Sequence, residues 1–126
     1  MELTGGIKGL KEEVVTEELT AEAVGSGGLP VYATPYMIRL MEYAAWTSVQ
    51  ECMDEGNTTV GTLMDVKHVS ASPLGAHIKC ETELTEVDGR RLKFKVSAFD
   101  EKGLIGEGEH ERFIVNEEKF MSKLVK

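Results

Sequence analysis

Cysteine is nearly absent from this sequence. Its two cysteines, Cys52 and Cys80, form no Cys-x-x-Cys pair, so the chain offers neither a disulfide framework nor a cysteine-rich zinc site. With 126 residues, the chain buries enough surface to fold without either. We therefore expect both cysteines to be small core residues of a protein in a reducing compartment.

Positive charge is also scarce, and long apolar runs are missing. Lysine and arginine number 14 against 22 acidic residues, a net charge of −8, whereas nucleic-acid binding needs a basic surface. No apolar stretch approaches the roughly 20 residues that cross a bilayer, and residues 1–10 lack the apolar segment of a signal peptide. The sequence predicts one domain over residues 1–126, in the cytoplasm, without a nucleic-acid or membrane partner.

The histidines are too few and too scattered to suggest a metal site. His68, His77 and His110 form no His-x-His or His-x-x-x-His pair. No glycine-rich loop has the spacing of a phosphate-binding P-loop. We therefore expect neither a metal nor a cofactor.

One long amphipathic helix is expected among several strands. The residue patterns predict a strand over 10–23, a loop over 26–30, a helix from Thr34, strands over 60–68, 78–84, 92–98 and 104–115, and a terminal helix capped by Asn116. Hairpin turns are predicted at 87–90, where Asp-Gly favours a type I′ turn, and at 100–103. A single long helix can bury its apolar stripe only against a sheet. The fold class is therefore α+β, a curled antiparallel sheet around a central helix, and the open sheet edge suggests a dimer.

The helix start, 33–46, reads ATPYMIRLMEYAAW and contains a misplaced carboxylate. Thr34 is a suitable N-cap and Pro35 a suitable first helical residue. The apolar stripe consists of Ile38, Met41, Ala45, Val49 and Cys52. Glu42 falls at nearly the angle of Val49, inside that stripe. Glu42 either lies at the stripe's edge and reaches solvent, or has a role in acid–base chemistry.

Three other residues allow both a structural and a functional interpretation. Thr34 could cap the helix, or present a hydroxyl where the helix start stabilises negative charge. His68 shares a strand face with Met64 and Val66, so it is either a core or interface residue or a general base. His110 and Arg112 share a face with Gly106 and Gly108. That face is either a solvated polar ladder or a place where a backbone or ligand approaches closely.

The whole chain resembles the fluoroacetyl-CoA thioesterase-like branch of the hotdog-fold thioesterases. The stretches that carry the resemblance are VYATPYMIRLME (31–42), TTVGTLMDVKHVSASPLG (58–75), and EVDGR through FKVSAFDEKGLIGEGEHERFIV (86–115). Together they span the domain in the family's order. The resemblance implies a hotdog fold, with the long helix wrapped by the sheet, and a homodimer that hydrolyses an acyl-CoA thioester.

The resemblance also implies roles for five residues. The family's catalytic threonine, glutamate and histidine correspond to Thr34, Glu42 and His68. Its glycine beside the thioester carbonyl corresponds to Gly61, and an arginine near the site to Arg112. Thr34, Glu42 or a water molecule could each make the attack on the thioester.

Two features leave the ligand and the reaction open. Residues 25–30, GSGGLP, contain no phenylalanine, unlike the aromatic lid of the fluoroacetate-specific member, so the acyl group stays open. Lys119, Lys123 and Lys126 could bind the CoA phosphates or simply be solvated. The alternative to an enzyme is a hotdog dimer that binds acyl-CoA without hydrolysing it. A hotdog dehydratase or dehalogenase-like enzyme fits less well, because the long insertion and the His/Asp-type helix start are missing.

Overall fold

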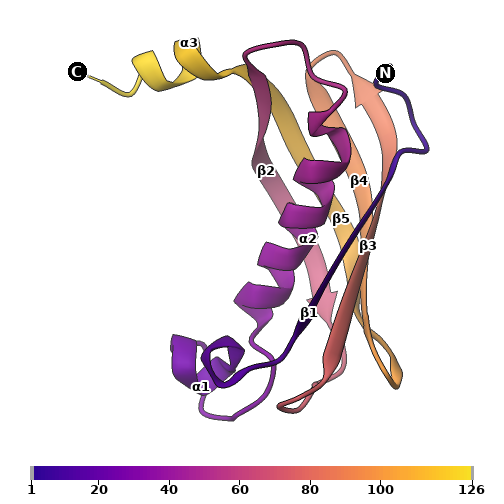
Figure 1. Cartoon of the computed structure of the whole chain (residues 1–126), viewed down its shortest axis with the longest axis vertical. Helices are drawn as coiled ribbons and strands as arrows, with labels where there is room; N and C mark the ends of the chain where they lie inside the picture. The colour runs from indigo at the N-terminus through magenta and orange to yellow at the C-terminus, as the bar shows by residue number, and fades with distance from the viewer. Residues whose placement is uncertain (1, 126) are drawn as a thin grey trace.

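A curled antiparallel sheet wraps around one long helix in the computed structural model, which describes residues 2–125 (Figure 1). The elements are β1 (Lys8–Val14), the 3-10 helix η1 (Glu17–Leu19), α1 (Ala21–Val24), α2 (Thr34–Gln50), β2 (Asn57–His68), β3 (His77–Asp88), β4 (Arg91–Asp100), β5 (Gly103–Asn116) and α3 (Glu117–Ser122). The strand order is β1-β3-β4-β5-β2, so β1 and β2 are the edges. This is the predicted hotdog arrangement, including the short C-terminal helix.

The inner face of the sheet follows the predicted alternation most closely in β3 and β4. The inward residues Ile78, Cys80, Thr82 and Leu84 of β3 and Leu92, Phe94, Val96 and Ala98 of β4 are all buried. The two strands meet through the two-residue turn Gly89–Arg90, in which Gly89 has a φ of +62°, a conformation that glycine adopts without strain. Arg90 has no positive φ, and a type I′ turn needs positive φ at both central residues, so the predicted turn type was wrong although its place was right. These two strands form the floor on which α2 packs.

The buried stripe of α2 differs from the predicted one. The buried residues are Met37, Leu40, Met41, Ala44, Ala45 and Val49. Val49 marks one edge of this stripe, and Ile38 and Cys52 are only partly buried. Glu42, close to Val49 in angle, therefore lies just past the edge, and 45% of its side chain is exposed. Of the positions that the sequence allowed, the structure therefore shows Glu42 at the edge of the stripe, in reach of solvent, and not inside it.

The start of α2 also corrects the sequence analysis. Ala33 occupies the N-cap position, Thr34 is the first helical residue, and no side chain caps the helix. The Thr34 hydroxyl therefore makes no hydrogen bond to a backbone N–H of the first turn. That hydroxyl is free to bond elsewhere.

The predicted strand over 10–23 ends early. After Val14 the chain forms η1 and α1, and Thr20 accepts a hydrogen bond from the backbone N–H of Ala23. Gly25, with a φ of +82°, ends α1. Local hydroxyl caps thus turn this segment away from the sheet and toward the start of α2, as Figure 1 shows at the end opposite the chain termini.

A bulge in β2 decides which of its residues face the helix. The register with β5 shifts between Gly61 and Leu63. After the bulge Met64, Val66 and His68 are the more buried residues, as predicted, but before it the inward residue is Thr59 rather than Val60 or Thr62. The predicted single alternation from Val60 to His68 was therefore wrong in its first half.

The glycines of β5 allow the sheet to curl. A Cβ on Gly106 would lie 2.5 Å from Met37 Sδ, and one on Gly108 would lie 2.6 Å from Val66 Cα. The helix α2 and the neighbouring strand β2 therefore both approach the backbone of β5 closely. As predicted, another backbone approaches β5 closely at this face. His110 and Arg112 lie on the same face and are buried, so the face is not a solvated polar ladder.

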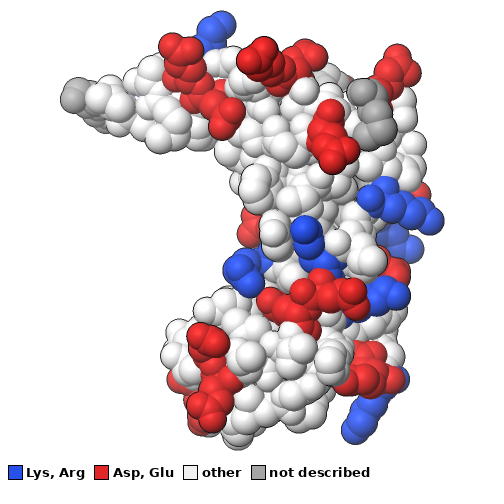
Figure 2. All heavy atoms as spheres, in the orientation of Figure 1, with Lys and Arg blue, Asp and Glu red and all other residues white. Residues whose placement is uncertain are grey.

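The C-terminal helix projects from the body of the molecule (Figure 1). Asn116 caps it, as predicted, by accepting a hydrogen bond from the backbone N–H of Lys119 at 3.1 Å. In the space-filling view the molecule is hollowed between this projection and the end that carries α1 (Figure 2). None of the helices within residues 2–125 has the length and apolar character that a bilayer crossing requires.

Candidate active site

Thr34 and His68 meet where the start of α2 faces the end of β2. Thr34 Oγ1 lies 2.8 Å from His68 Nδ1. The two side chains line a cavity of about 260 Å³, whose other walls are Ala21, Ser26, Val31, Tyr32, Val69, Ser70 and Ala71. A hydroxyl hydrogen-bonded to an imidazole in a cavity is the arrangement by which a base activates a nucleophile.

The environment of His68 keeps its imidazole neutral. Burial lowers the pKa of His68 below its ordinary value, and the backbone carbonyl of Ser70 offsets part of this effect. A neutral ring can accept the proton of Thr34 or of a water molecule. If Nδ1 is the acceptor, the ring proton sits on Nε2, which is buried and has no hydrogen-bond partner within residues 2–125.

Tyr32 connects this pair to the edge of the sheet. Its ring meets the His68 ring edge-on at a centroid distance of 6.3 Å. The Tyr32 hydroxyl donates a hydrogen bond to the carboxylate of Glu13 on β1, which also accepts one from Arg39 Nη2 at 3.1 Å. Burial and this bond raise the pKa of Tyr32, so its hydroxyl stays a donor. This contact was not predicted, because no local sequence pattern relates residue 13 to residue 32.

Glu42 belongs to a second cluster. Its Oε2 lies 3.5 Å from Nη1 of Arg112, whose side chain is only 8% exposed. A Cβ on Gly61 would lie 2.7 Å from the same Oε2, so glycine is what allows the carboxylate to rest against β2. Glu42 and Arg112 line a second cavity, of about 410 Å³, together with Arg39, Tyr43 and Trp46.

The single chain therefore brings the five predicted site residues together as two groups. Thr34 and His68 form one, and Glu42, Gly61 and Arg112 form the other. Within residues 2–125, Glu42 makes no hydrogen bond to Thr34 or His68. The roughly 12 Å between Thr34 and Glu42 along α2 explains the separation, since eight helical residues span that length.

Two more polar residues surround Arg112. Thr59 accepts hydrogen bonds from Nε at 2.8 Å through its hydroxyl and from Nη2 at 3.0 Å through its carbonyl. His110 Nε2 lies 3.2 Å from Nη1. The sequence analysis placed His110 on the same face as Arg112 but did not find Thr59, because the bulge in β2 sets its direction.

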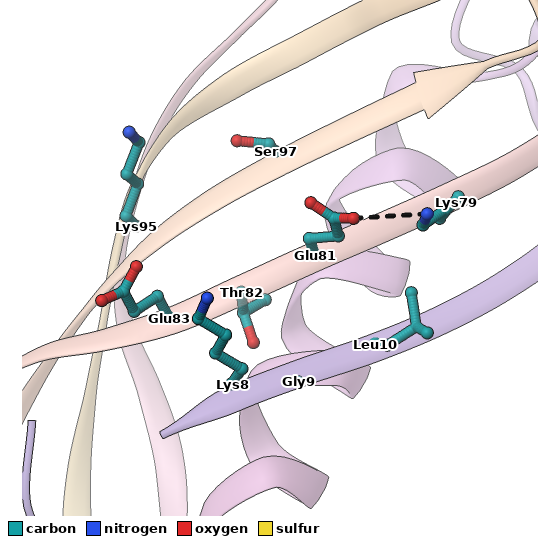
Figure 3. A pocket seen from close by; sticks show the side chains of 9 residues that line it. All are labelled: Lys8, Gly9, Leu10, Lys79, Glu81, Thr82, Glu83, Lys95 and Ser97. Carbon is teal, nitrogen blue, oxygen red and sulfur yellow. Dashed lines mark ion pairs between the residues drawn. The ribbon is translucent and has the colours of Figure 1, made fainter. Parts of the chain in front are cut away.

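A third cavity lies on the face of the sheet that points away from α2 (Figure 3). Its volume is about 380 Å³, and the residues around it are Lys8, Gly9, Leu10, Lys79, Glu81, Thr82, Glu83, Lys95 and Ser97. Lys79 and Glu81 form an ion pair at 3.4 Å. Three lysines and two glutamates line this cavity, but no histidine does, so it offers no acid–base pair comparable to Thr34 and His68. No group of acidic, histidine or cysteine side chains in residues 2–125 could hold a metal ion.

Comparison with known proteins points to one family. A profile of the family described as "Fluoroacetyl-CoA-specific thioesterase" matches residues 15–118. The fluoroacetyl-CoA thioesterase of Streptantibioticus cattleyicolor is 39% identical over 94 residues, which are 75% of this chain and 68% of that protein.

Solved structures agree with this match. A crystal structure of the fluoroacetyl-CoA thioesterase superposes with a TM-score of 0.91 at 32% identity, covering 98% of this chain and 96% of the other. A Thermus thermophilus protein described as a thioesterase superfamily member superposes with a TM-score of 0.88 at 29% identity, covering 96% and 90%.

Proposed function

The chain belongs to the fluoroacetyl-CoA-specific thioesterase family, and from this we propose that it hydrolyses the thioester of a small acyl-CoA. The observation that carries the proposal is the 2.8 Å contact between Thr34 Oγ1 and His68 Nδ1 inside a cavity. A cavity of about 260 Å³ suits a short acyl group and the thioester, with the rest of CoA outside. The product pair is a carboxylate and the free thiol of CoA.

In the proposed mechanism His68 is the general base. Its neutral Nδ1 removes the proton of Thr34 or of a water molecule, and the oxygen attacks the thioester carbonyl. The tetrahedral intermediate collapses with loss of the CoA thiolate, which takes up a proton. If Thr34 attacks, water then hydrolyses the acyl-threonine ester in a second step.

The start of α2 can stabilise the oxyanion. Pro35 has no N–H, and the N–H groups of Tyr36 and Met37 are bonded to the Ala33 carbonyl at 3.0 and 3.2 Å. Thr34 is therefore the residue at the helix start whose backbone N–H can donate to a negatively charged oxygen. Gly61, beside Glu42, is the other candidate for contact with the thioester.

We propose that the protein works as a homodimer that joins the two groups of site residues. In the dimer, Glu42 of a second copy would supply the carboxylate that the Thr34–His68 pair does not contact within one chain. The free outer edge of β2, which runs for 12 residues and carries both His68 and Gly61, supports this interface. The hollow in Figure 2 leaves room for a second copy beside α2.

Thiol release from a panel of acyl-CoA thioesters tests the function. We expect turnover with at least one short, branched, aromatic or halogenated acyl group. Thr34→Ala, Glu42→Ala and His68→Ala should each lower kcat about 100-fold or more with the fold retained, whereas the exposed His77→Ala should not. Tight CoA binding with no thiol release from any substrate would instead identify a non-catalytic binder, and unchanged turnover in all three variants would reject this mechanism.

Mixing two inactive variants tests the shared site. If Glu42 acts across the interface, a heterodimer of Thr34→Ala and Glu42→Ala contains one intact site. Random pairing then restores about a quarter of wild-type activity, because half of the dimers each regain one of two sites. If all residues act within one copy, the mixture stays inactive.

The finer parts of the interpretation stay predictions. Lys119 and Lys123 on and beside α3 are candidates for the CoA phosphates, and Lys126 lies outside the described residues. The cytoplasmic location and the absence of a cofactor also stay predictions from the sequence.

A further inference from the structure

His110 is a buried histidine whose two nitrogens both have partners. The residue lies on β5 and is 1% exposed, with its ring stacked on Phe94 at a centroid distance of 5.9 Å. Nδ1 lies 2.7 Å from the backbone carbonyl oxygen of Leu63, and Nε2 lies 3.2 Å from Nη1 of Arg112. The ring is thus held between the bulge of β2 and a guanidinium.

These partners determine the form of the ring. A carbonyl oxygen only accepts, so Nδ1 carries the proton and donates it to Leu63. A guanidinium only donates, so Nε2 carries a lone pair that accepts from Arg112. The contacts are therefore compatible with one neutral tautomer and not with the imidazolium, whose second N–H would point at a cation.

His110 completes the set of acceptors around Arg112. Thr59 binds Nε and Nη2, while Nη1 is shared between His110 Nε2 and Glu42 Oε2 at 3.2 and 3.5 Å. Because the guanidinium is largely buried, an N–H without an acceptor is costly. Without His110, Nη1 would have only the longer contact with the half-exposed Glu42 carboxylate, and the guanidinium could swing toward solvent.

We propose that His110 is a positioning residue: its neutral Nδ1–H form holds the Arg112 guanidinium beside Glu42 and Gly61, and protonation of its ring releases it. The proposal deepens the proposed function, because Glu42, Gly61 and Arg112 make up one of its two residue groups. It assigns no contact with substrate to His110 itself.

The charges around His110 favour this neutral form. Burial lowers the pKa of His110, as does the Arg112 cation, while the Leu63 carbonyl and the carboxylates of Glu42 and Glu111 act in the opposite direction. The net shift is downward, so the ring stays neutral at pH 7. Release of Arg112 therefore belongs to mildly acidic conditions, below the ordinary histidine range.

The test compares two substitutions of similar size. His110→Gln keeps an acceptor oxygen near the place of Nε2, whereas His110→Phe keeps the stacking on Phe94 but has no acceptor. We expect His110→Phe to lower kcat about tenfold, the equivalent of one buried hydrogen bond, and to remove the acid limb that His110 adds to the pH profile. His110→Gln should restore most of kcat. Phe94→Leu, which loosens the ring's packing but leaves its acceptor, is the control.

A measurement without substrate separates this proposal from the proposed function. Nitrogen-15 NMR of the resting protein should show His110 as the Nδ1–H tautomer at pH 7 and slow solvent exchange of the Arg112 side-chain N–H groups. That exchange should become fast in His110→Phe and stay slow in His110→Gln. An imidazolium, the Nε2–H tautomer, or equal Arg112 exchange in both variants would overturn the proposal even if thioester hydrolysis is found. Failure of hydrolysis with these NMR results intact would reject only the proposed function.

Discussion

The hydroxyl of Thr34 has a different hydrogen-bond partner in the structure from the one that its position in the sequence predicts. As an N-cap its hydroxyl would have bonded a backbone N–H of the helix, but Ala33 occupies that position and the hydroxyl bonds His68 instead. The residue type and its place beside Pro35 are visible in the sequence. Its partner is 34 residues away, so no local pattern could identify it.

Tyr32 offers a prediction about the same pair. Tyr32→Phe removes the hydrogen bond to Glu13, while Glu13 keeps Arg39. We expect a loss of about 1 kcal/mol in the free energy of unfolding. Because the Tyr32 ring packs on His68, kcat should also fall several-fold with KM unchanged. Urea unfolding and thiol release measure the two effects.

Tyr36→Phe is the matched control for that change. Tyr36 lies on the same stretch of chain, contacts Arg39 through its ring, and its hydroxyl makes no hydrogen bond within residues 2–125. Equal kcat for the two variants would show that the tether to Glu13 does not position His68.

The strand β5 depends on glycine because of curvature. Gly108→Ala would place a Cβ against the backbone of Asp65 and Val66, which cannot move as a side-chain end can. We expect a loss of about 1–3 kcal/mol in the free energy of unfolding, the usual cost of overpacking. Gly28→Ala, at a site with nothing within 4 Å, should leave the unfolding midpoint nearly unchanged. Similar midpoints for the two variants would contradict this account of the curl.

Gly61→Ala should lower activity and leave stability nearly unchanged, the reverse of what we expect for Gly108→Ala. Its Cβ would meet Glu42 Oε2 at 2.7 Å, the far end of a flexible and half-exposed side chain. The carboxylate can move aside, so stability should change little while kcat falls. A strongly destabilised protein, or unchanged kcat in thiol-release assays, would show that Gly61 does not serve Glu42.

The elements were predictable where packing follows a simple period. The alternation of β3 and β4 follows from residue type, because one face of those strands is uniformly buried. Gly89 marked the place of their hairpin, but not that Gly89 and Arg90 are its central residues. The residues after Val14 were mispredicted because Thr20 and Gly25 cap a short helix in a stretch of mixed apolar and charged residues. The bulge at Gly61 has no sequence signal beyond a glycine, yet it turns Thr59 toward Arg112.

For the whole molecule, the buried His110 and the partly buried His68 predict how stability depends on pH. Burial lowers the pKa of both His68 and His110 below the unfolded value of about 6.5. The unfolded chain therefore binds more protons just below that pH, and the free energy of unfolding decreases as pH falls through the folded pKa values. Urea unfolding between pH 7.5 and pH 5, at roughly unit steps, should show this decline, and His110→Phe should reduce its slope. A slope that His110→Phe leaves unchanged would contradict the assignment.

The oligomeric state offers a second prediction at this level. Sedimentation should give about twice the 13.9 kDa chain mass. Leu63→Lys, on the free edge strand β2, should favour the monomer and lower thiol release together. Leu10→Lys, an equally exposed change on the other edge strand, should affect neither. A dimer disrupted by Leu10→Lys alone would place the interface at β1 and remove the basis for a site shared across β2.

The sequence by itself determined the order of the long helix and the later strands, because periodicity and turns are local properties. The five site residues come from family resemblance, and their roles stay predictions. Only the tertiary structure decided which of these residues contact one another: Thr34 with His68, Glu42 with Arg112, and His110 with Leu63 and Arg112. Those pairings depend on the curl of the sheet, on one bulge and on where the buried stripe of α2 ends. Such features come from packing between distant segments, which no local pattern encodes.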